Sequence, residues 1–493
     1  MNVLYVSAEV APYLKTGGLG DVSEALPLAL AQRDIPVSIV TPHYRKVAEY
    51  FRENAVPVIR SHTIRVMLAG TYHEAQIHES RHPSDERIPV YTVDAPEYYD
   101  RPGIYTDGMR DYPDNAARFV FFAKAVIELI RILDADDSAP DIVHCSDWHT
   151  GLVSFFIKQV YASMRPFDRI AYIYAIHNLA YQGVFAPLDY PLFGADRELL
   201  TAGGLEHNGM LNFMKAGIVN ADAVVTVSPT YAREILTDEF GFGLGGVIRT
   251  HRKKLIGILN GARYETWSPE HDRHLPARYS IKDMSGKAES RKRLCEIFNV
   301  TCRDDIAVVG IVGRLTWQKG FDLLIPIIGR LLQRNIVLIV LGQGEMKYET
   351  SFTAWQRMKP GAIGVKIEFN EPLAHLVEAG SDMFLMPSLF EPCGLNQIYS
   401  MRYGNVPVVR KTGGLADTVS DAGDDPAGGT GFVFADYSSD ALYAAIERAL
   451  GAFADKKIWD RIVMNGMKTD FSWARASAHY IACYKKALRK NER

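Results

Sequence analysis

Residues 383–415 read MFLMPSLFEPCGLNQIYSMRYGNVPVVRKTGGL and predict a strand, a tight turn and a helix twice in succession. The apolar run Met383–Met386 has the length of a buried parallel strand, and apolar positions at helical spacing follow over Leu395–Tyr403. A second strand, Val406–Val409, then leads into the glycine turn Lys411–Gly414. In an open α/β sheet, ligands bind at the carboxyl ends of such strands, where helix N-termini present free N–H groups.

Glu391 lies in the polar turn between the first of these strands and its helix. Backbone N–H groups at a helix N-terminus favour anions, and a carboxylate beside them can accept hydrogen bonds from hydroxyl groups. The turn therefore suits a neutral, hydroxyl-rich group whose neighbour is anionic, and we expect Glu391 to hold that group.

The alternation of strands and helices continues through the whole chain, which is typical of doubly wound, parallel α/β sheets. The strands predicted in the first half are Val3–Ser7, Val37–Thr41, three runs between Thr63 and Val93, Ile142–His144, Ile170–Ile176 and Ala223–Val227. Those predicted in the second half are Ala307–Val312, Val337–Leu341, Val365–Phe369, Met383–Met386, Val406–Val409 and Phe432–Phe434. The helices predicted in the first half are Asp21–Gln32, Asn115–Leu133, Gly151–Tyr161, Asn212–Val219 and Pro229–Glu239.

A chain of 493 residues is too long for one core and indicates two or three domains. We place an N-terminal domain at residues 1–257 and a second domain at 258–471, with a C-terminal helix over 472–493 packing back on the first. The two halves share a glycine turn, because KTGGLGDV at residues 15–22 matches KTGGLADTV at residues 411–419. This repetition favours two similar domains.

The composition, 47% hydrophobic and 23% charged with a net charge of −3, is ordinary for a globular enzyme and offers no case for nucleic acid or an anionic membrane. The five cysteines are scattered, which argues for a reducing compartment and against a disulfide framework. No apolar run approaches the roughly 18 residues that a bilayer requires, and the N-terminus has no charged leader. We therefore expect a cytoplasmic protein.

The run GRLTWQKG, residues 313–320, follows a predicted strand and opens a helix. One interpretation is a capped turn with two solvated cations. The other is a clamp for a diphosphate, because arginine supplies planar bidentate donors and lysine a mobile point charge. We favour the clamp, since Arg314 and Lys319 both lie beside glycines at the carboxyl end of a strand.

Other patterns give little support to a metal site or a dinucleotide site. The pairs Asp147/His149 and His177/Asn178 follow strands, but neither has the spacing of a His-x-x-x-His site. Residues 241–246 fit G-x-G-x-x-G yet follow a helix rather than a strand, which makes a dinucleotide oxidoreductase a weak alternative. Residues 134–136 fit the D-x-D pattern of metal-dependent sugar transferases but lie in an acidic turn that ends a long helix.

Six motifs together resemble those of bacterial glycogen synthases and plant starch synthases: KTGGLGDV, SDWHTG, AIHNLAYQG, GRLTWQKG, FEPCGLNQ and the second KTGGLADTV. The resemblance runs in matching order from Met1 to the DFSW segment at 470–473, nearly the whole chain. It implies the GT-B fold, two Rossmann-like domains facing each other across a cleft. The implied activity is transfer of glucose from ADP-glucose to the non-reducing 4-hydroxyl of an α-1,4-glucan, with retention and with neither a cofactor nor a required metal.

The resemblance also implies roles for individual residues. Arg314 and Lys319 would hold the diphosphate, Glu391 would bind the glucose hydroxyls, and His177 would lie beside the reacting glucose. Front-face attack is implied, with the leaving phosphate taking the acceptor's proton, so that Glu391 orients hydroxyl groups and forms no covalent bond. The implied donor-binding positions are Lys15, Gly17, Gly18, Asp21, Asp147, Asn260, Phe369, Cys393, Gly394, Leu395, Thr412 and Gly413.

Two positions depart from the family pattern in the donor region. The aromatic residue that stacks on adenine is commonly Tyr, and the matching residue here is Phe369. The usual acidic residue of N-G-[IV]-D is replaced by Arg263. UDP-glucose therefore stays an alternative donor. A nucleotide-sugar epimerase and a non-catalytic glucan-binding scaffold are the alternatives from other classes, and the retained Lys15, His177, Arg314, Lys319 and Glu391 argue against the scaffold. The sequence does not indicate an oligomeric state.

Overall fold

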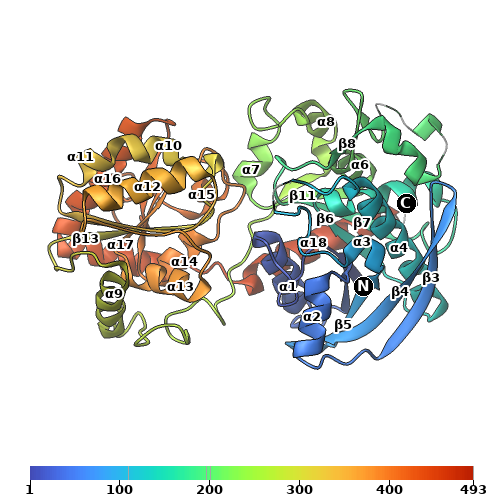
Figure 1. Cartoon of the computed structure of the whole chain (residues 1–493), viewed down its shortest axis with the longest axis horizontal. Helices are drawn as coiled ribbons and strands as arrows, with labels where there is room; N and C mark the ends of the chain where they lie inside the picture. Colours follow the sequence, from blue (N-terminus) through green and yellow to red (C-terminus); the bar gives the residue numbers. More distant parts are fainter. Residues whose placement is uncertain (109, 196, 200, 202, 492–493) are drawn as a thin grey trace. The chain divides into compact units, whose positions relative to one another are not determined.

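The computed structural model describes residues 1–108, 110–195, 197–199, 201 and 203–491, which form two compact units (Figure 1). Unit 1 comprises Met1–Val227, Ala232–Ile258 and Trp473–Arg493, and unit 2 comprises Ser228–Tyr231 and Leu259–Ser472. The observed division differs from the boundary at 257/258 by one residue and by the short excursion Ser228–Tyr231, which packs with unit 2.

The large sheet of unit 1 has the strand order β12-β11-β7-β6-β1-β2-β5-β4-β3. Its strands are β1 (Val3–Val6), β2 (Val37–Pro42), β3 (Arg60–Leu68), β4 (Thr71–His82), β5 (Asp85–Asp94), β6 (Ile142–Ser146), β7 (Ala171–Ile176), β11 (Ala223–Thr226) and β12 (Leu255–Gly257). The strands from β12 to β5 are parallel, but β4 runs antiparallel to both β5 and β3. Exposed and buried residues alternate along β3, as in an antiparallel strand with one solvent-exposed face, so this edge departs from the parallel arrangement that the sequence predicted.

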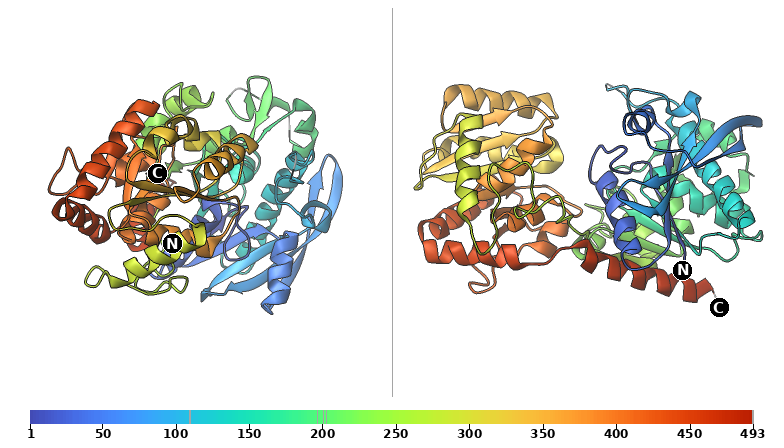
Figure 2. Two further views of the ribbon diagram at one scale, coloured as in Figure 1. Left: turned by 60° about the vertical axis from the view of Figure 1, so that its left-hand side comes forward. Right: turned by 90° about the horizontal axis from the view of Figure 1, so that it is seen from below.

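Helices cover both faces of this sheet, so the doubly wound class is confirmed for unit 1. They are α1 (Gly18–Ala31), α2 (Arg45–Glu53), α3 (Pro96–Tyr99), α4 (Asn115–Ala135), α5 (Gly151–Phe155), α6 (Phe213–Asn220) and α8 (Gly245–Thr250). Helix α7 (Pro229–Glu234) begins in unit 2 and ends in unit 1, and it is shorter than the predicted helix Pro229–Glu239. The sequence did not predict α2 or the small sheet of β8 (Val184–Phe185), β10 (Met210–Asn212) and β9 (Glu206–His207). The last helix, α18 (Trp473–Asn491), packs on α1 and β7 of unit 1 (Figure 2), and residues 492–493 lie outside the described residues.

The sheet of unit 2 is parallel throughout, with the strand order β15-β14-β13-β16-β17-β18. Its strands are β13 (Ala307–Val312), β14 (Ile336–Leu341), β15 (Ile363–Lys366), β16 (Met383–Met386), β17 (Val406–Arg410) and β18 (Phe432–Phe434). This is the 3-2-1-4-5-6 order, in which the direction of winding reverses between the first and fourth strands, here β13 and β16. The loops that follow β13 and β16 therefore flank the switch point, where doubly wound folds bind ligands.

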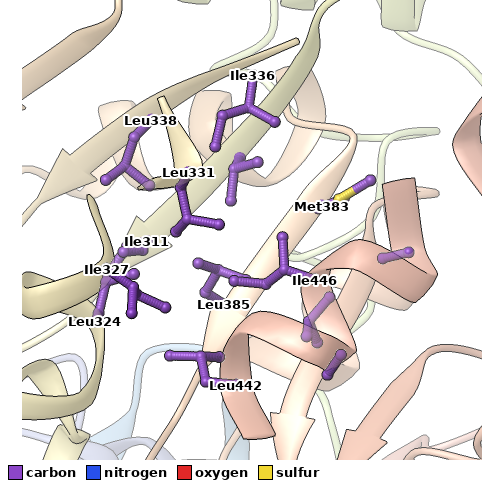
Figure 3. Close-up of a cluster of buried hydrophobic side chains, with 14 of the residues drawn as sticks. Ile311, Leu324, Ile327, Leu331, Ile336, Leu338, Met383, Leu385, Leu442 and Ile446 are labelled. Carbon is purple, nitrogen blue, oxygen red and sulfur yellow. The ribbon is translucent and has the colours of Figure 1, made fainter. Parts of the chain in front are cut away.

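Strand residues of unit 2 alternate between two apolar layers. In β14, Ile336, Leu338 and Val340 belong to one buried cluster, and the residues between them belong to the other. Figure 3 shows the first cluster, in which Leu338 and Leu385 meet helical side chains such as Leu331 and Ile446. Both faces are covered by helices, so most strand residues are buried, which explains why these strands read as continuous apolar runs in the sequence.

The helices of unit 2 lie on both faces of its sheet (Figure 1). They are α9 (Ser285–Phe298), α10 (Phe321–Leu324), α11 (Ile328–Leu331), α12 (Met346–Met358), α13 (Glu371–Gly380), α14 (Asn396–Arg402), α15 (Gly413–Thr418), α16 (Ser439–Ala454) and α17 (Lys456–Lys468). The prediction of a strand over Val365–Phe369 is wrong in its bounds, because β15 spans Ile363–Lys366. Phe369 is consequently a loop residue beyond the carboxyl end of that strand.

Gly320 fixes how the loop after β13 approaches the loop after β16. Its φ is +73°, and a Cβ at this position would lie 1.9 Å from the carbonyl oxygen of Pro387. We expect Gly320→Ala to lower the free energy of unfolding by more than about 1 kcal/mol, because strain and a backbone clash add. Thermal unfolding followed by circular dichroism measures this as a lower Tm.

The matched control is Gly451→Ala in α16, where an added Cβ meets nothing within 4 Å. Alanine there restricts the unfolded chain and suits a helix, so it should stabilise by about 0.4–1 kcal/mol. Equal Tm values for the two variants would contradict the proposed packing of the Gly320 turn.

Candidate active site

The switch point of unit 2 brings together three residues that the sequence predicted to act on one ligand. The Nζ atom of Lys319, after β13, lies 2.6 Å from Oε2 of Glu391, after β16. The hydroxyl group of Ser388 donates to the same carboxylate oxygen at 3.1 Å, and Glu391 is only 6% exposed. Arg314 is exposed, and its guanidinium makes no hydrogen bond or ion pair with any other described residue. A buried carboxylate and its lysine partner thus contact each other at the carboxyl edge of the sheet, and an exposed arginine lies in the same loop as the lysine.

Hydrogen bonds hold the two loops in register. The side-chain amide of Gln318 donates to the carbonyl oxygen of Phe390 at 3.2 Å, and the Leu389 amide donates to the Gln318 carbonyl oxygen at 2.9 Å. These hydrogen bonds join the residue before Lys319 to the two residues before Glu391. The two loops are therefore already held together where the ion pair forms. This is preorganisation in the sense that catalysis requires.

The second glycine turn packs directly beneath the Glu391 loop. The Gly414 amide donates to the Glu391 carbonyl oxygen at 3.0 Å, and Thr412 is buried just before α15. A Cβ on Gly413 would lie 1.9 Å from the Glu391 carbonyl oxygen, so only glycine allows this approach. The structure therefore brings Thr412 and Gly413 to the turn that contains Cys393, Gly394 and Leu395, as the sequence predicted for a shared pocket.

Cys393 and Asn260 adjoin inside unit 2. The backbone N–H of Asn260 faces the Cys393 thiol, and burial raises the pKa of that thiol to about 12, so it is protonated at neutral pH. Asn260 is 5% exposed, and its Oδ1 has no hydrogen-bond partner among the described residues. A buried acceptor without a partner is costly, so Asn260 Oδ1 is suited to a donor from a ligand.

Phe369 stands apart from these residues on the same edge of the sheet. It is 77% exposed and follows β15, which is separated from β13 by β14. At about 4.8 Å per strand, β15 and β13 are about 10 Å apart. An exposed phenyl ring two strands away from β13 on the same edge can stack on a flat group at the far end of an extended ligand.

Unit 1 presents its own cluster at the carboxyl ends of β6 and β7. Asp147 accepts a hydrogen bond from the His177 amide at 2.8 Å. Burial raises the pKa of Asp147 to about 7 and lowers the pKa of His177 to about 4. His177 is thus neutral at physiological pH, and its Nε2 is buried with no partner among the described residues. The ring is free to exchange a hydrogen bond with a ligand hydroxyl group.

The first glycine turn differs from its counterpart in unit 2. A Cβ added to Gly17 or Gly18 would meet no described atom within 4 Å, and both residues are exposed where α1 begins. Beside this turn, Lys15 Nζ lies 3.1 Å from Asp21 Oδ1. The open space over the turn allows a ligand to approach the backbone closely.

Sequence reasoning missed two residues of unit 1, Glu9 and Tyr105. Glu9 is 3% exposed and accepts hydrogen bonds from the Thr16 amide at 2.6 Å and from the Tyr105 hydroxyl at 2.7 Å. The Tyr105 ring stacks on His149 with centroids 4.6 Å apart. Glu9 therefore links the loop before the first glycine turn to the segment that contains Tyr105. The sequence feature that could have indicated Glu9 is that it is the single carboxylate in the largely apolar stretch after β1.

The described residues form neither a metal-binding cluster nor a membrane-spanning helix. Across the described part of the chain, no three His, Cys, Asp or Glu side chains lie close enough together to bind a metal ion. None of the helices within those same residues combines the length and the apolar character needed to cross a bilayer.

The raised pKa of Asp147 makes a prediction about stability and pH. The folded protein keeps this proton up to about pH 7, whereas the unfolded chain releases it near pH 4. The folded state therefore binds more protons in this window, and the free energy of unfolding falls as pH rises through it. Asp147→Asn keeps an accepting oxygen without the charge, so the Tm of the variant relative to wild type should be higher at pH 8 than at pH 5.

The matched control is Asp34→Asn, which removes the same charge from a side chain that is 94% exposed. Both positions have positive φ, which asparagine tolerates. Differential scanning fluorimetry at both pH values measures the effect. A pH-independent Tm difference for Asp147→Asn would show that the carboxyl group does not titrate as described.

Comparison with known proteins identifies the family. The family model described as "Starch synthase catalytic domain" matches residues 2–250, and "Glycosyl transferases group 1" matches residues 296–457. The chain is 44% identical to a glycogen synthase of Anaeromyxobacter sp. (strain Fw109-5), over 98% of this chain and 99% of that protein. It is 41% identical to a glycogen synthase of Koribacter versatilis (strain Ellin345), over 99% and 98%.

A solved structure agrees with this assignment. The catalytic domain of starch synthase IV from Arabidopsis thaliana, bound to ADP and acarbose, superimposes with a TM-score of 0.88 at 31% identity, covering 99% of each chain. The GT-B class expected from the sequence is thereby confirmed. The chain belongs to the family of glycogen and starch synthases, and it is a glycosyltransferase that elongates glucans.

Proposed function

We propose that the protein transfers glucose from ADP-glucose to the non-reducing 4-hydroxyl of an α-1,4-glucan, with retention of configuration. The observation that carries this proposal is the contact of Lys319 with Glu391 at the switch point, beside the available Arg314. The similar starch synthase IV is bound to ADP and acarbose, which supports a nucleoside diphosphate and a glucan as the ligands of this chain.

In this proposal Lys319 and Arg314 act on the diphosphate that leaves. Breaking the bond between the anomeric carbon and the phosphate oxygen builds negative charge on the diphosphate. Cations already in place stabilise that charge more in the transition state than in the ground state, usually the largest single contribution to catalysis. Lys319 would exchange its partner, Glu391, for a phosphate oxygen as the donor binds.

Glu391 then becomes available to the glucose hydroxyl groups. A retaining glycosidase places a carboxylate nucleophile beneath the sugar ring. Here the Glu391 carboxylate accepts hydrogen bonds from Lys319 and Ser388. Glu391 and Ser388 belong to the turn after β16, which would bind the sugar. We assign Glu391 an orienting role, with the acceptor attacking from the face that the phosphate leaves and the phosphate taking the acceptor's proton.

The remaining polar groups serve recognition. His177 supplies a neutral ring nitrogen for a glucose hydroxyl group, Asn260 supplies an unpartnered oxygen, and Phe369 supplies a stacking surface for the base. Lys15 and the Gly17–Gly18 turn would meet the phosphates and the glucose, with Asp21 near the nucleotide. We propose that no metal ion is required, because the cations of the protein take its place.

Removing the Lys319 charge tests the role of the pair. We expect Lys319→Ala to lower kcat by about 10²–10³, comparable with the loss of one oxyanion donor. Arg314→Ala should have a similar effect. The measurement is ADP release in the presence of a maltooligosaccharide at saturating substrate concentrations.

The control is Lys456→Ala, which removes an exposed lysine from the first turn of α17. It should retain wild-type kcat. A Lys319→Ala enzyme with kcat near that of wild type would rule out the proposed action on the leaving diphosphate.

The donor is tested by competition between ADP-glucose and UDP-glucose in one reaction with maltoheptaose, in the presence of EDTA. We expect chain extension with preferential release of ADP, because Phe369 offers a flat surface suited to the larger purine ring. Preferential release of UDP would overturn the assignment of the base, and loss of activity in EDTA would overturn the metal-free mechanism. An altered sugar nucleotide without chain extension would instead indicate an epimerase.

A further inference from the structure

We propose that Trp317 is the surface on which the acceptor glucan stacks, and that it determines how short an acceptor the protein extends. This inference rests on the proposed function, because it concerns the second substrate of the same reaction. Trp317 has no role in the donor site as described above.

Trp317 is unusual in its exposure. Among the described Phe, Tyr and Trp residues of unit 2, only Trp317 and Phe369 are exposed, at 47% and 77%. Both follow strands at the ligand-binding edge, Trp317 after β13 and Phe369 after β15. Single exposed apolar residues are common on protein surfaces, so exposure alone would carry little. What sets Trp317 apart is that its loop also contains Arg314 and Lys319, and that its backbone and one side of its ring are held in place.

The anchoring has three parts. The Trp317 amide donates to Glu345 Oε1 at 2.6 Å, which fixes the backbone. The indole packs on Phe390, the residue before Glu391, with ring centroids 5.5 Å apart at 54°. The backbone at Gly320 then packs closely against the carbonyl group of Pro387. An exposed ring whose backbone and one flank are fixed loses little conformational freedom when a ligand binds.

The chemistry of the reaction places the acceptor next to this ring. In attack from the face that the phosphate leaves, the acceptor oxygen approaches beside the departing diphosphate. Arg314 and Lys319 would hold that diphosphate, and Trp317 lies between them in the same loop. The terminal acceptor sugar must therefore adjoin this loop, whereas the base lies towards Phe369, beyond β14. A sugar, not the base, is the group within reach of Trp317.

The indole suits a glucan in particular. A glucose ring carries its hydroxyl groups at the rim and C–H groups on its faces, so one face is apolar. The face of an aromatic ring is electronegative and attracts such polarised C–H groups, and indole is the strongest aromatic in this respect. Stacking on Trp317 would bind any α-1,4-linked chain without fixing its length.

The test compares wild type, Trp317→Ala and Trp317→Phe with maltotriose and with glycogen as acceptors. We expect Trp317→Ala to raise the KM for maltotriose roughly 3- to 10-fold, the range for loss of an aromatic stacking partner. The KM for glycogen should change less, because its many chain ends rebind after dissociation. Trp317→Phe should restore most of the maltotriose affinity. The Kd for ADP, measured by calorimetry, should be unchanged in both variants.

Phe369→Ala serves as the control on the same edge of the sheet, because Phe369 is proposed to contact the donor and not the acceptor. It should raise the KM for ADP-glucose and leave the KM for maltotriose unchanged. A Trp317→Ala enzyme with wild-type KM for maltotriose would overturn the inference. So would an equal fall in kcat with both acceptors together with a lower Tm, since that pattern indicates a purely structural role.

Tryptophan fluorescence separates this inference from the proposed function. Maltotriose added to wild type without donor should change the emission, and Trp317→Phe should lose most of that change. If wild type transfers no glucose at all, the proposed function fails, and the titration still decides whether Trp317 binds the glucan. If wild type is active and its titration matches that of Trp317→Phe, the inference about Trp317 fails alone.

Discussion

The ion pair between Lys319 and Glu391 is the interaction on which the rest of the site depends. The carboxylate is almost fully buried, and a buried charge is tolerated only with a partner and with hydrogen bonds. Lys319 supplies the partner, and Ser388 supplies a further hydrogen bond. A sugar diphosphate can replace them together, because its hydroxyl groups satisfy Glu391 and its phosphates satisfy Lys319. The ligand that fits is therefore the one that releases both members of the pair at once.

The two glycine turns show how one sequence serves two purposes. In unit 2, Gly413 and Gly414 allow the backbone of the Glu391 loop to approach, so these glycines position the carboxylate. In unit 1, Gly17 and Gly18 face open space at the start of a helix, so they leave room for a ligand. The repeated sequence therefore forms a turn before a helix in both units, but the glycines of the two turns have different surroundings.

Much of unit 2 could be predicted from the sequence because its strands are buried on both faces and its ligand-binding turns contain glycine. Apolar runs such as Ala307–Val312 then mark the strands directly, and the residues after them mark the site. The end of β15 could not be placed, since apolar residues continue past it, and Phe369 was assigned to the strand although it lies in a loop. Glu9 was missed for a different reason. Its partners, Thr16 and Tyr105, come from two separate loops, and only the folded chain brings them together.

In the proposed mechanism, Lys319 changes partners when the donor binds. A crystal structure of the protein with ADP tests this most directly, with the distances from Lys319 Nζ to the phosphate oxygens and to Glu391 Oε2 as the readout. We predict a phosphate oxygen within hydrogen-bonding distance of Lys319 Nζ and of the Arg314 guanidinium, and a Glu391 carboxylate released from the 2.6 Å contact. ADP bound elsewhere, with the Lys319–Glu391 pair intact, would contradict the account.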